Sequence, residues 1–135
     1  MTKLKVNHIG YAVKSIDAAI AHYQTLFDVS VSGREVLTSR GIEIAFLDGE
    51  NTRIELLQSL EENTPLHRFI EKRGEGLHHV CYEVSDIKSE LARIKALGFE
   101  LIDPVPRPGA HGTMIAFVHP QNFFGVLTEF CEILF

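Results

Sequence analysis

Two histidines and two glutamates recur at matching places in the two halves of the chain. His8 in NHIGYAV and His79 in HHVCYEV are 71 residues apart, and Glu55 in TRIELL and Glu129 in VLTEFC are 74 apart. Two imidazoles and two carboxylates form a nitrogen and oxygen donor set suited to a divalent first-row metal such as Co, Ni, Zn, Fe or Mn. We therefore predict that these four residues bind one metal ion, with two octahedral positions open for water or substrate.

Each of these residues, taken alone, has a simpler interpretation. A lone histidine on a strand commonly packs in the core or makes a hydrogen bond, and a lone glutamate on a strand is commonly exposed. The matched pairs favour the metal interpretation. His78 adjoins His79 on the same strand and should therefore face the opposite side. The other histidines have no counterpart in the repeat and are predicted not to be ligands: His22, His67, His111 and His119.

The pairs belong to a longer internal repeat. At the offset of 71 residues, Tyr11 matches Tyr82 and Val13 matches Val84, and AFL at 45–47 matches AFV at 116–118. The order of these matches predicts two homologous halves, about 3–60 and 75–134, within a single domain of residues 1–135. Residues that are equivalent in the halves should lie at equivalent places about a pseudo-twofold axis.

Each half has the pattern of a strand, a helix and three further strands. Helices are predicted in SIDAAIAHYQTLF, capped by Ser15, and in SDIKSELARIKALG, capped by Ser85 or Asp86. Thr64 followed by Pro65 predicts a linking helix at about 65–73. The predicted strands are 5–13, 29–37, 42–49, 52–58, 77–84, 99–102, 113–119 and 125–133. We expect an α+β fold in which two βαβββ repeats form an eight-stranded, half-open curved sheet around a metal-binding cavity.

The composition narrows the class of partner. The chain has 13 basic and 18 acidic residues with no basic stripe, which argues against a nucleic-acid surface. No apolar run is long enough to span a bilayer, and the N-terminal residues lack the apolar core of a signal peptide. We expect a cytoplasmic protein that acts on a small molecule. Cys81 and Cys131 are predicted to be packing thiols.

With these residues in view, the chain resembles the methylmalonyl-CoA epimerase family within the vicinal-oxygen-chelate superfamily. The resemblance covers nearly the whole chain and rests on NHIGYAV, EKRGEGLHHVCYEV, GAHG, FVHP and GVLTEF, in that order. It implies the metal ligands His8, Glu55, His79 and Glu129, the same set that the repeat predicts. It also implies a homodimer and one divalent metal ion, with Co, Ni, Zn or Mn expected.

The resemblance further implies a reaction. An acyl-CoA with a methyl and a carboxylate on C2 would lose and regain its C2 proton through a metal-stabilised enolate, which interconverts the (R) and (S) epimers. Glu129 is the first candidate acid/base, because a carboxylate at the metal can exchange between ligand and base. Glu43 is the second candidate, and Glu55 is its pseudo-symmetric rival.

Three other functions share parts of this pattern. A glyoxalase I-type lactoylglutathione lyase uses similar ligands on a glutathione hemithioacetal. A metal-free binding module keeps the fold and loses ligands, which four intact candidates argue against. An extradiol dioxygenase needs two histidines and one carboxylate around iron, and its larger members are much longer than this chain.

Overall fold

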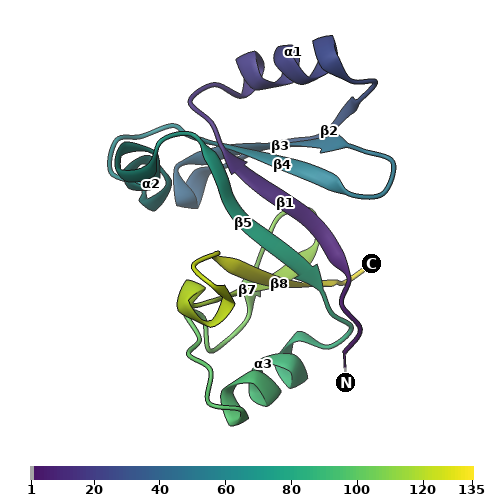
Figure 1. The fold of residues 1–135 in the computed structure, drawn as a ribbon, viewed down its shortest axis with the longest axis vertical. Helices are drawn as coiled ribbons and strands as arrows, with labels where there is room; N and C mark the ends of the chain where they lie inside the picture. Colours follow the sequence, from purple (N-terminus) through teal and green to yellow (C-terminus); the bar gives the residue numbers. More distant parts are fainter. Residues whose placement is uncertain (1) are drawn as a thin grey trace. The chain divides into compact units, whose positions relative to one another are not determined.

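Three α-helices and eight strands make up residues 2–135, which a computed structural model describes (Figure 1). The helices are α1 (Ile16–Leu26), α2 (Pro65–Arg73) and α3 (Ile87–Ala96). The strands are β1 (Val6–Ala12), β2 (Ser30–Leu37), β3 (Ile42–Asp48), β4 (Arg53–Ser59), β5 (Gly76–Glu83), β6 (Arg107–Pro108), β7 (Thr113–Val118) and β8 (Thr128–Ile133).

The strands form one eight-stranded mixed sheet in the order β2-β3-β4-β1-β5-β8-β7-β6. Strands β5 and β8 pair in parallel, whereas β2 with β3, β3 with β4, β6 with β7 and β7 with β8 pair antiparallel. The predicted α+β class with an eight-stranded sheet is therefore confirmed. The parallel β5–β8 pair matters for function, because it sets Cys81 opposite Glu129 and so fixes the register of two ligand-bearing strands.

One predicted strand was wrong. Residues 99–102 form no strand; Leu101 makes only an isolated bridge to Val118, and the edge strand is β6. The segment at 99–102 is apolar enough to suggest a strand, but the backbone N–H groups of Ile102 and Asp103 both donate to one carbonyl, that of Phe117. A regular ladder spaces its hydrogen bonds along the partner strand, so this doubling ends the pairing there.

Side-chain caps set the start of each helix. Ser15 accepts a hydrogen bond from the Ala18 N–H, Thr64 from the His67 N–H and Asp86 from the Ser89 N–H. The structure therefore selects Asp86 over Ser85 for α3. The linking helix α2 spans the predicted residues 65–73, with Pro65 in its first turn.

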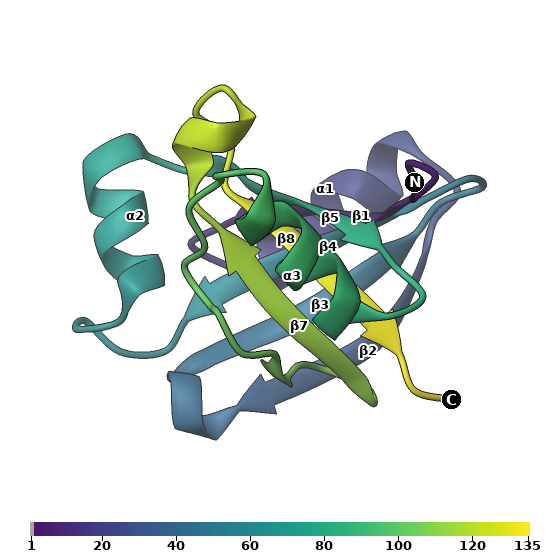
Figure 2. The same cartoon turned by 90° about the horizontal axis from the view of Figure 1, so that it is seen from below.

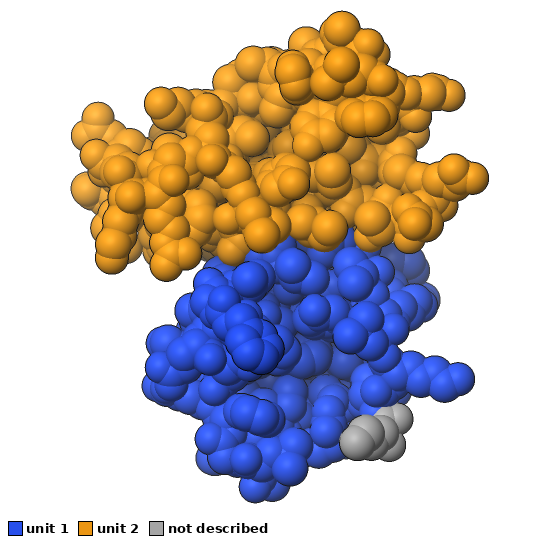
Figure 3. Space-filling view, viewed as in Figure 1, with its two compact units in different colours: residues 1–8, 79–135 blue, residues 9–78 orange. Residues whose placement is uncertain are grey.

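The chain divides into two compact units, which Figure 3 colours separately. Unit 1 consists of residues 1–8 and 79–135, and unit 2 consists of residues 9–78. In unit 1, α3 lies across β7 and β8 (Figure 2) and buries Leu91 and Ile94 against Val118 and Phe130. The opposite face of the same strands buries a second cluster, Cys81, Ile115, Phe117 and Cys131.

Unit 2 repeats this arrangement with other residues. Helix α1 packs on β3 and β4, where Ile16 is buried with Ala45, Leu47 and Leu56. None of the helices within residues 2–135 is both long and apolar enough to cross a bilayer. Each unit thus has a helix on one face of its strands, which leaves the other face for polar side chains that could do chemistry.

Candidate metal centre

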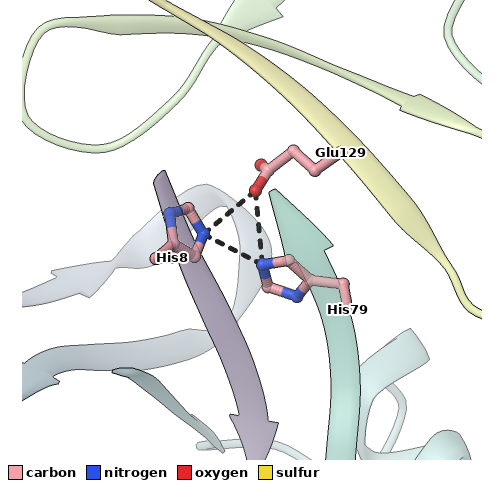
Figure 4. A group of neighbouring side chains, drawn as sticks. All are labelled: His8, His79 and Glu129. Atoms are coloured by element: carbon pink, nitrogen blue, oxygen red, sulfur yellow. Dashed lines mark hydrogen bonds and ion pairs between the residues drawn. The ribbon is translucent and has the colours of Figure 1, made fainter. Parts of the chain in front are cut away.

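Three of the four predicted ligands converge within unit 1. His8 extends from β1, His79 from β5 and Glu129 from β8, and Figure 4 shows the three side chains pointing toward one another. The His8 and His79 Nε2 atoms are 3.1 Å apart, and each lies 3.2 Å from Oε1 of Glu129. The three residues are separated in the sequence by 71 and by 50 positions, and each places one donor atom at a corner of a nearly equilateral triangle.

The triangle has the dimensions of three neighbouring ligands around one metal ion. With metal–ligand bonds of about 2.1 Å, two adjacent ligand atoms are about 3.0 Å apart in octahedral geometry and about 3.4 Å apart in tetrahedral geometry. The observed separations of 3.1 and 3.2 Å lie between these values. Three donors on one side of an ion leave its other side open.

The hydrogen bonding of the cluster also fits a cation. Oε1 of Glu129 is buried and makes no hydrogen bond of acceptable geometry within residues 2–135, although both imidazole nitrogens are close. Nδ1 of His8 lies 2.7 Å from Oδ1 of Asn7, an amide oxygen that can only accept, so Nδ1 carries the hydrogen. Neutral His8 therefore presents a lone pair at Nε2, toward a carboxylate oxygen that also presents lone pairs. A bound cation removes this repulsion, and the residues present fit a divalent metal.

Burial and charge prepare Glu129 to act as a ligand. The exposed fractions of His8, His79 and Glu129 are 6%, 1% and 5%. Burial by itself raises the pKa of the Glu129 carboxyl, but the adjoining imidazoles of His79 and then His8, which can donate and carry positive charge when they are protonated, outweigh it and hold the pKa well below its usual range. Glu129 is consequently ionised at neutral pH, which is the form that binds metals.

A polar chain behind His8 orients its ring. Asn7 accepts from His8 Nδ1 and donates through Nδ2 to Oε1 of Glu83 at 3.0 Å, and Lys5 Nζ donates to Oε2 of Glu83 at 2.8 Å. This is the second layer of hydrogen bonds that metal-binding histidines commonly have. The sequence analysis missed Asn7 because its counterpart in the repeat is His78, so the repeat gave no signal.

Apolar side chains surround the cluster. The Phe117 ring meets the His79 ring edge to face, with centroids 5.9 Å apart, and Phe117 pairs with Glu129 across β7 and β8. Cys81 and Cys131, two residues beyond His79 and Glu129 on the same strand faces, are free and buried, as expected of packing thiols. Burial raises the pKa of the Cys81 thiol, so that thiol stays protonated.

Glu55, the fourth predicted ligand, lies in unit 2. It is 8% exposed and pairs with Phe46 across β3 and β4, on the strand face that does not carry α1. Arg53, two residues earlier on that face, stacks over the Phe46 ring at 4.0 Å. Glu55 is thus a buried carboxylate, like its repeat counterpart Glu129.

Glu43 lies on the opposite face of unit 2 from Glu55. It pairs with Gln58 of β4. On β3 it lies on the same face as Ala45 and Leu47, which pack under α1. Its Oε2 accepts from Arg34 Nε at 2.8 Å, and Arg34 Nη1 donates to Asp17 of α1 at 2.7 Å. Glu43 therefore joins β2, β3 and α1 in an ion-pair network, and it cannot share a strand face with Glu55.

His78 lies apart from the cluster, as its position beside His79 implies. Its ring packs edge to face on Phe69 of α2 in unit 2, with centroids 4.8 Å apart. His67 pairs with Glu71 on α2 at 3.1 Å, and His119 accepts a hydrogen bond from the Gln121 N–H. A matching position in the repeat therefore distinguishes His8 and His79, which lie in the cluster, from these three histidines, which lie outside it.

Comparison with known proteins places the chain in a family. A sequence model of the glyoxalase/bleomycin resistance protein/dioxygenase superfamily matches residues 7–117, well over half of the chain. The chain belongs to this superfamily. The matched residues include His8, Glu55 and His79, and the resemblance found from the sequence is confirmed.

Relatives within the superfamily match most of the chain. The ethylmalonyl-CoA/methylmalonyl-CoA epimerase of Cereibacter sphaeroides is 37% identical over 127 residues, 93% of this chain and 95% of that protein. A solved methylmalonyl-CoA epimerase in complex with methylmalonyl-CoA and NH4+ is 30% identical with a TM-score of 0.89, covering 97% of this chain and 95% of that one. A hypothetical protein of Bacillus halodurans is 42% identical with a TM-score of 0.92, covering 96% and 94%.

Proposed function

We propose that this superfamily member is a metal-dependent epimerase that interconverts (R)- and (S)-methylmalonyl-CoA. The observation that carries the proposal is the buried triangle of His8, His79 and Glu129, whose donor atoms are 3.1 to 3.2 Å apart. The similarity to epimerases of methylmalonyl-CoA over more than nine tenths of the chain supports the substrate class. We propose Glu55 as the fourth ligand, and Co, Ni, Zn or Mn as the metal.

The proposed reaction removes and returns the proton on C2, next to the thioester. When bound, a divalent cation supplies a Lewis acid that stabilises the negative charge developing on the substrate as that proton leaves. His8 and His79 would be rigid ligands of the cation, because both are buried on strands and the Asn7 amide fixes the His8 ring. The rings and thiols around His79 exclude water, which strengthens electrostatic interactions at the reacting atoms.

We propose that Glu129 moves the C2 proton on one face of the substrate. Its carboxyl stays ionised because the two histidines lower its pKa, so it is a base at neutral pH. Oε1 is directed to the imidazoles of His8 and His79. An acid or base placed in this way contributes about 10²- to 10⁴-fold in rate.

Epimerisation also needs a group on the other face of C2, and we propose Glu55 for it. Glu55 is buried and occupies the repeat position equivalent to Glu129. Glu43, the other candidate from the sequence, accepts a hydrogen bond from Arg34 on the strand face that carries α1, away from the face of Glu55, so we propose it second.

The experiment is proton NMR in deuterated water with one epimer of methylmalonyl-CoA and metal-loaded protein. We expect loss of the C2 proton signal together with appearance of the other epimer, and neither event with a His79→Ala variant. A His22→Ala variant, which removes an exposed histidine from α1, should behave as the wild type. Well-folded, metal-loaded protein that leaves C2 unexchanged would overturn the proposal, and the hemithioacetal of methylglyoxal and glutathione would then be the next substrate to test.

We also propose that the chain forms a homodimer, as the resemblance to the superfamily implies. The test is light scattering coupled to size exclusion, which should give twice the chain mass of 15.2 kDa. A mass equal to a single chain would contradict it.

A further inference from the structure

A chain of hydrogen bonds connects His8 of the cluster to an ion pair at the surface of unit 1. Oδ1 of Asn7 lies 2.7 Å from Nδ1 of His8, and Nδ2 of Asn7 donates to Oε1 of Glu83 at 3.0 Å. Lys5 Nζ donates to Oε2 of Glu83 at 2.8 Å, and this hydrogen bond raises the pKa of the Lys5 amine, which stays charged. The Lys5 side chain is 66% exposed and that of Glu83 is 20% exposed. The chain thus runs from solvent to the buried ring.

The outer end of this chain decides which atoms donate at its inner end. A carboxylate only accepts hydrogen bonds, so Oε1 of Glu83 requires the NH2 group of Asn7 on its side. The Asn7 oxygen is thereby turned toward His8 and requires a hydrogen on Nδ1. The lone pair of the neutral ring is then on Nε2, the nitrogen that lies 3.2 Å from Oε1 of Glu129.

An amide by itself does not fix this arrangement. When an asparagine side chain turns by half a rotation, its oxygen and its NH2 group exchange places, and a donor replaces the acceptor. Asn7 therefore needs a neighbour that accepts and cannot donate, and Glu83 is that neighbour. The Glu83 backbone N–H also donates to the Lys5 carbonyl at 2.8 Å, which holds the end of β5 beside the residue that precedes β1.

We propose that Glu83 is a positioning residue that acts through Asn7 to select the tautomer of His8 that can bind the metal. The inference rests on the metal centre of the proposed function. The hydrogen bond at one ring nitrogen determines which tautomer a histidine presents to a metal at the other. A His8 ring with its hydrogen on Nε2 would direct an N–H group at the ion and could not bind it through that atom. The ion pair with Lys5 keeps Glu83 in place at the outer end.

A Glu83→Gln variant should reverse the assignment. The new amide has one oxygen, and the ammonium of Lys5 takes it because an ammonium can only donate. The NH2 group of the new amide then faces Asn7, whose side chain turns and presents its own NH2 group to Nδ1 of His8. We expect the ring hydrogen of His8 to move to Nε2 and the metal affinity to fall about 10- to 100-fold.

Asn7→Asp tests whether this loss passes through the side chain of Asn7. In the Glu83→Gln background it exchanges the positions of carboxylate and amide, so that Nδ1 of His8 faces a carboxylate. Because a carboxylate only accepts, the hydrogen returns to Nδ1. The double variant should therefore recover the wild-type tautomer and most of the lost metal affinity.

Two measurements read the tautomer and the affinity separately. Proton–nitrogen NMR spectra of the histidine rings show which nitrogen of His8 carries the hydrogen, in metal-free protein at about pH 9, well above the ordinary histidine pKa of about 6.5. A competition titration against a chromophoric chelator gives the Kd of the metal. Glu90→Gln is the matched control, because it neutralises a buried carboxylate of unit 1 that pairs with Arg93 and has no place in the chain behind His8.

The expected result is a changed tautomer and a weakened metal site in Glu83→Gln, recovery of both in the double variant, and neither change in Glu90→Gln. A wild-type tautomer in Glu83→Gln, or an equal loss of metal affinity in Glu90→Gln, would overturn the inference. Because the NMR measurement uses metal-free protein, it tests the inference even if the wild-type protein binds no metal, a result that would overturn the proposed function instead.

Discussion

The chemistry of the site depends on where three potential ligand atoms point. His8, His79 and Glu129 each direct one nitrogen or oxygen atom at one point, and an oxygen of Asn7 fixes the ring of His8 in that orientation. In a buried position, the lone pairs of His8 and Glu129 that face one another repel unless a proton or a cation lies between them. The metal hypothesis therefore follows from the convergence of these atoms and does not depend on residue type alone.

The hydrogen bond between Asn7 and His8 gives the first prediction. An Asn7→Ala variant loses the acceptor that holds the hydrogen on His8 Nδ1, and metal affinity should fall about 10- to 100-fold. The measurement is a competition titration against a chromophoric chelator, with Asn51→Ala, in an exposed turn, as the matched control. An unchanged affinity in Asn7→Ala would show that the amide has no part in orienting the ring.

The second prediction distinguishes the two glutamates of unit 2. Glu55→Gln should lower kcat by about 10²-fold or more, because an amide cannot exchange the C2 proton. Glu43→Gln should change kcat no more than a few-fold, since Glu43 pairs with Arg34 under α1. Steady-state epimerisation assays on both variants decide between them, and the reverse ranking would restore Glu43 as the acid/base.

At the scale of elements, strand pairing brings the ligands together, and the helices pack on the opposite face of the strands. Strands β5 and β8 are neighbours in a parallel register that sets Cys81 opposite Glu129, so His79 and Glu129 share a strand face near one another. Helix α3 packs on β7 and β8 from the other face. Because α3 directly follows β5, its first turn also fixes how the chain leaves the strand that carries His79.

The cap of α3 gives a prediction about pH. The backbone N–H and then the hydroxyl of Ser89 donate to Asp86 and lower the pKa of its carboxyl below the ordinary value of 3.8. A group with a lowered pKa stabilises the fold above its unfolded-state pKa, and this contribution is lost as the pH falls through the folded-state value. Asp86→Asn keeps a capping oxygen and cannot ionise.

The measurement is the thermal midpoint of both proteins at pH 7 and at roughly pH 3. Wild-type protein should be the more stable of the two at pH 7, and the difference should shrink at the lower pH. A difference that is independent of pH would mean that the charge of Asp86 contributes nothing.

The sequence predicts the elements and the central ligands because both depend on patterns that repeat. Apolar periodicity and capping residues locate the helices, and the matched positions of His8 and His79 identify the pair that the strands bring together. Residues 99–102 and β6 were misassigned, because an apolar run does not reveal whether its N–H groups find separate partners. Asn7 was missed for a related reason: it acts through one specific contact, and a single contact leaves no periodic signal.

At the scale of the whole molecule, the metal site links binding to folding. The three clustered ligands come from the two separate segments of unit 1, residues 1–8 and 79–135, so they are brought together only when that unit is folded. A ligand that binds the folded state alone stabilises it by RT ln(1 + [L]/Kd). Metal should therefore raise the stability of unit 1 as well as supply chemistry.

Removing the metal gives the fourth prediction. Treatment with a chelator should lower the free energy of unfolding by about 2.7 kcal/mol relative to protein with free metal at 100 times its Kd. Denaturant unfolding with and without chelator measures this difference, and a His79→Ala variant should show none of it. Equal stabilisation of His79→Ala by the metal would place the ion elsewhere.

The most direct test of the account is a stepwise addition of divalent metal to chelator-treated protein while epimerisation of methylmalonyl-CoA is followed. We expect the rate to rise in proportion to the metal added and to stop rising at one equivalent per chain, whereas His79→Ala should gain no activity at any addition. Full activity in chelator-treated protein, or restoration of the His79→Ala variant by metal, would contradict the claim that His8, His79 and Glu129 form the catalytic metal centre.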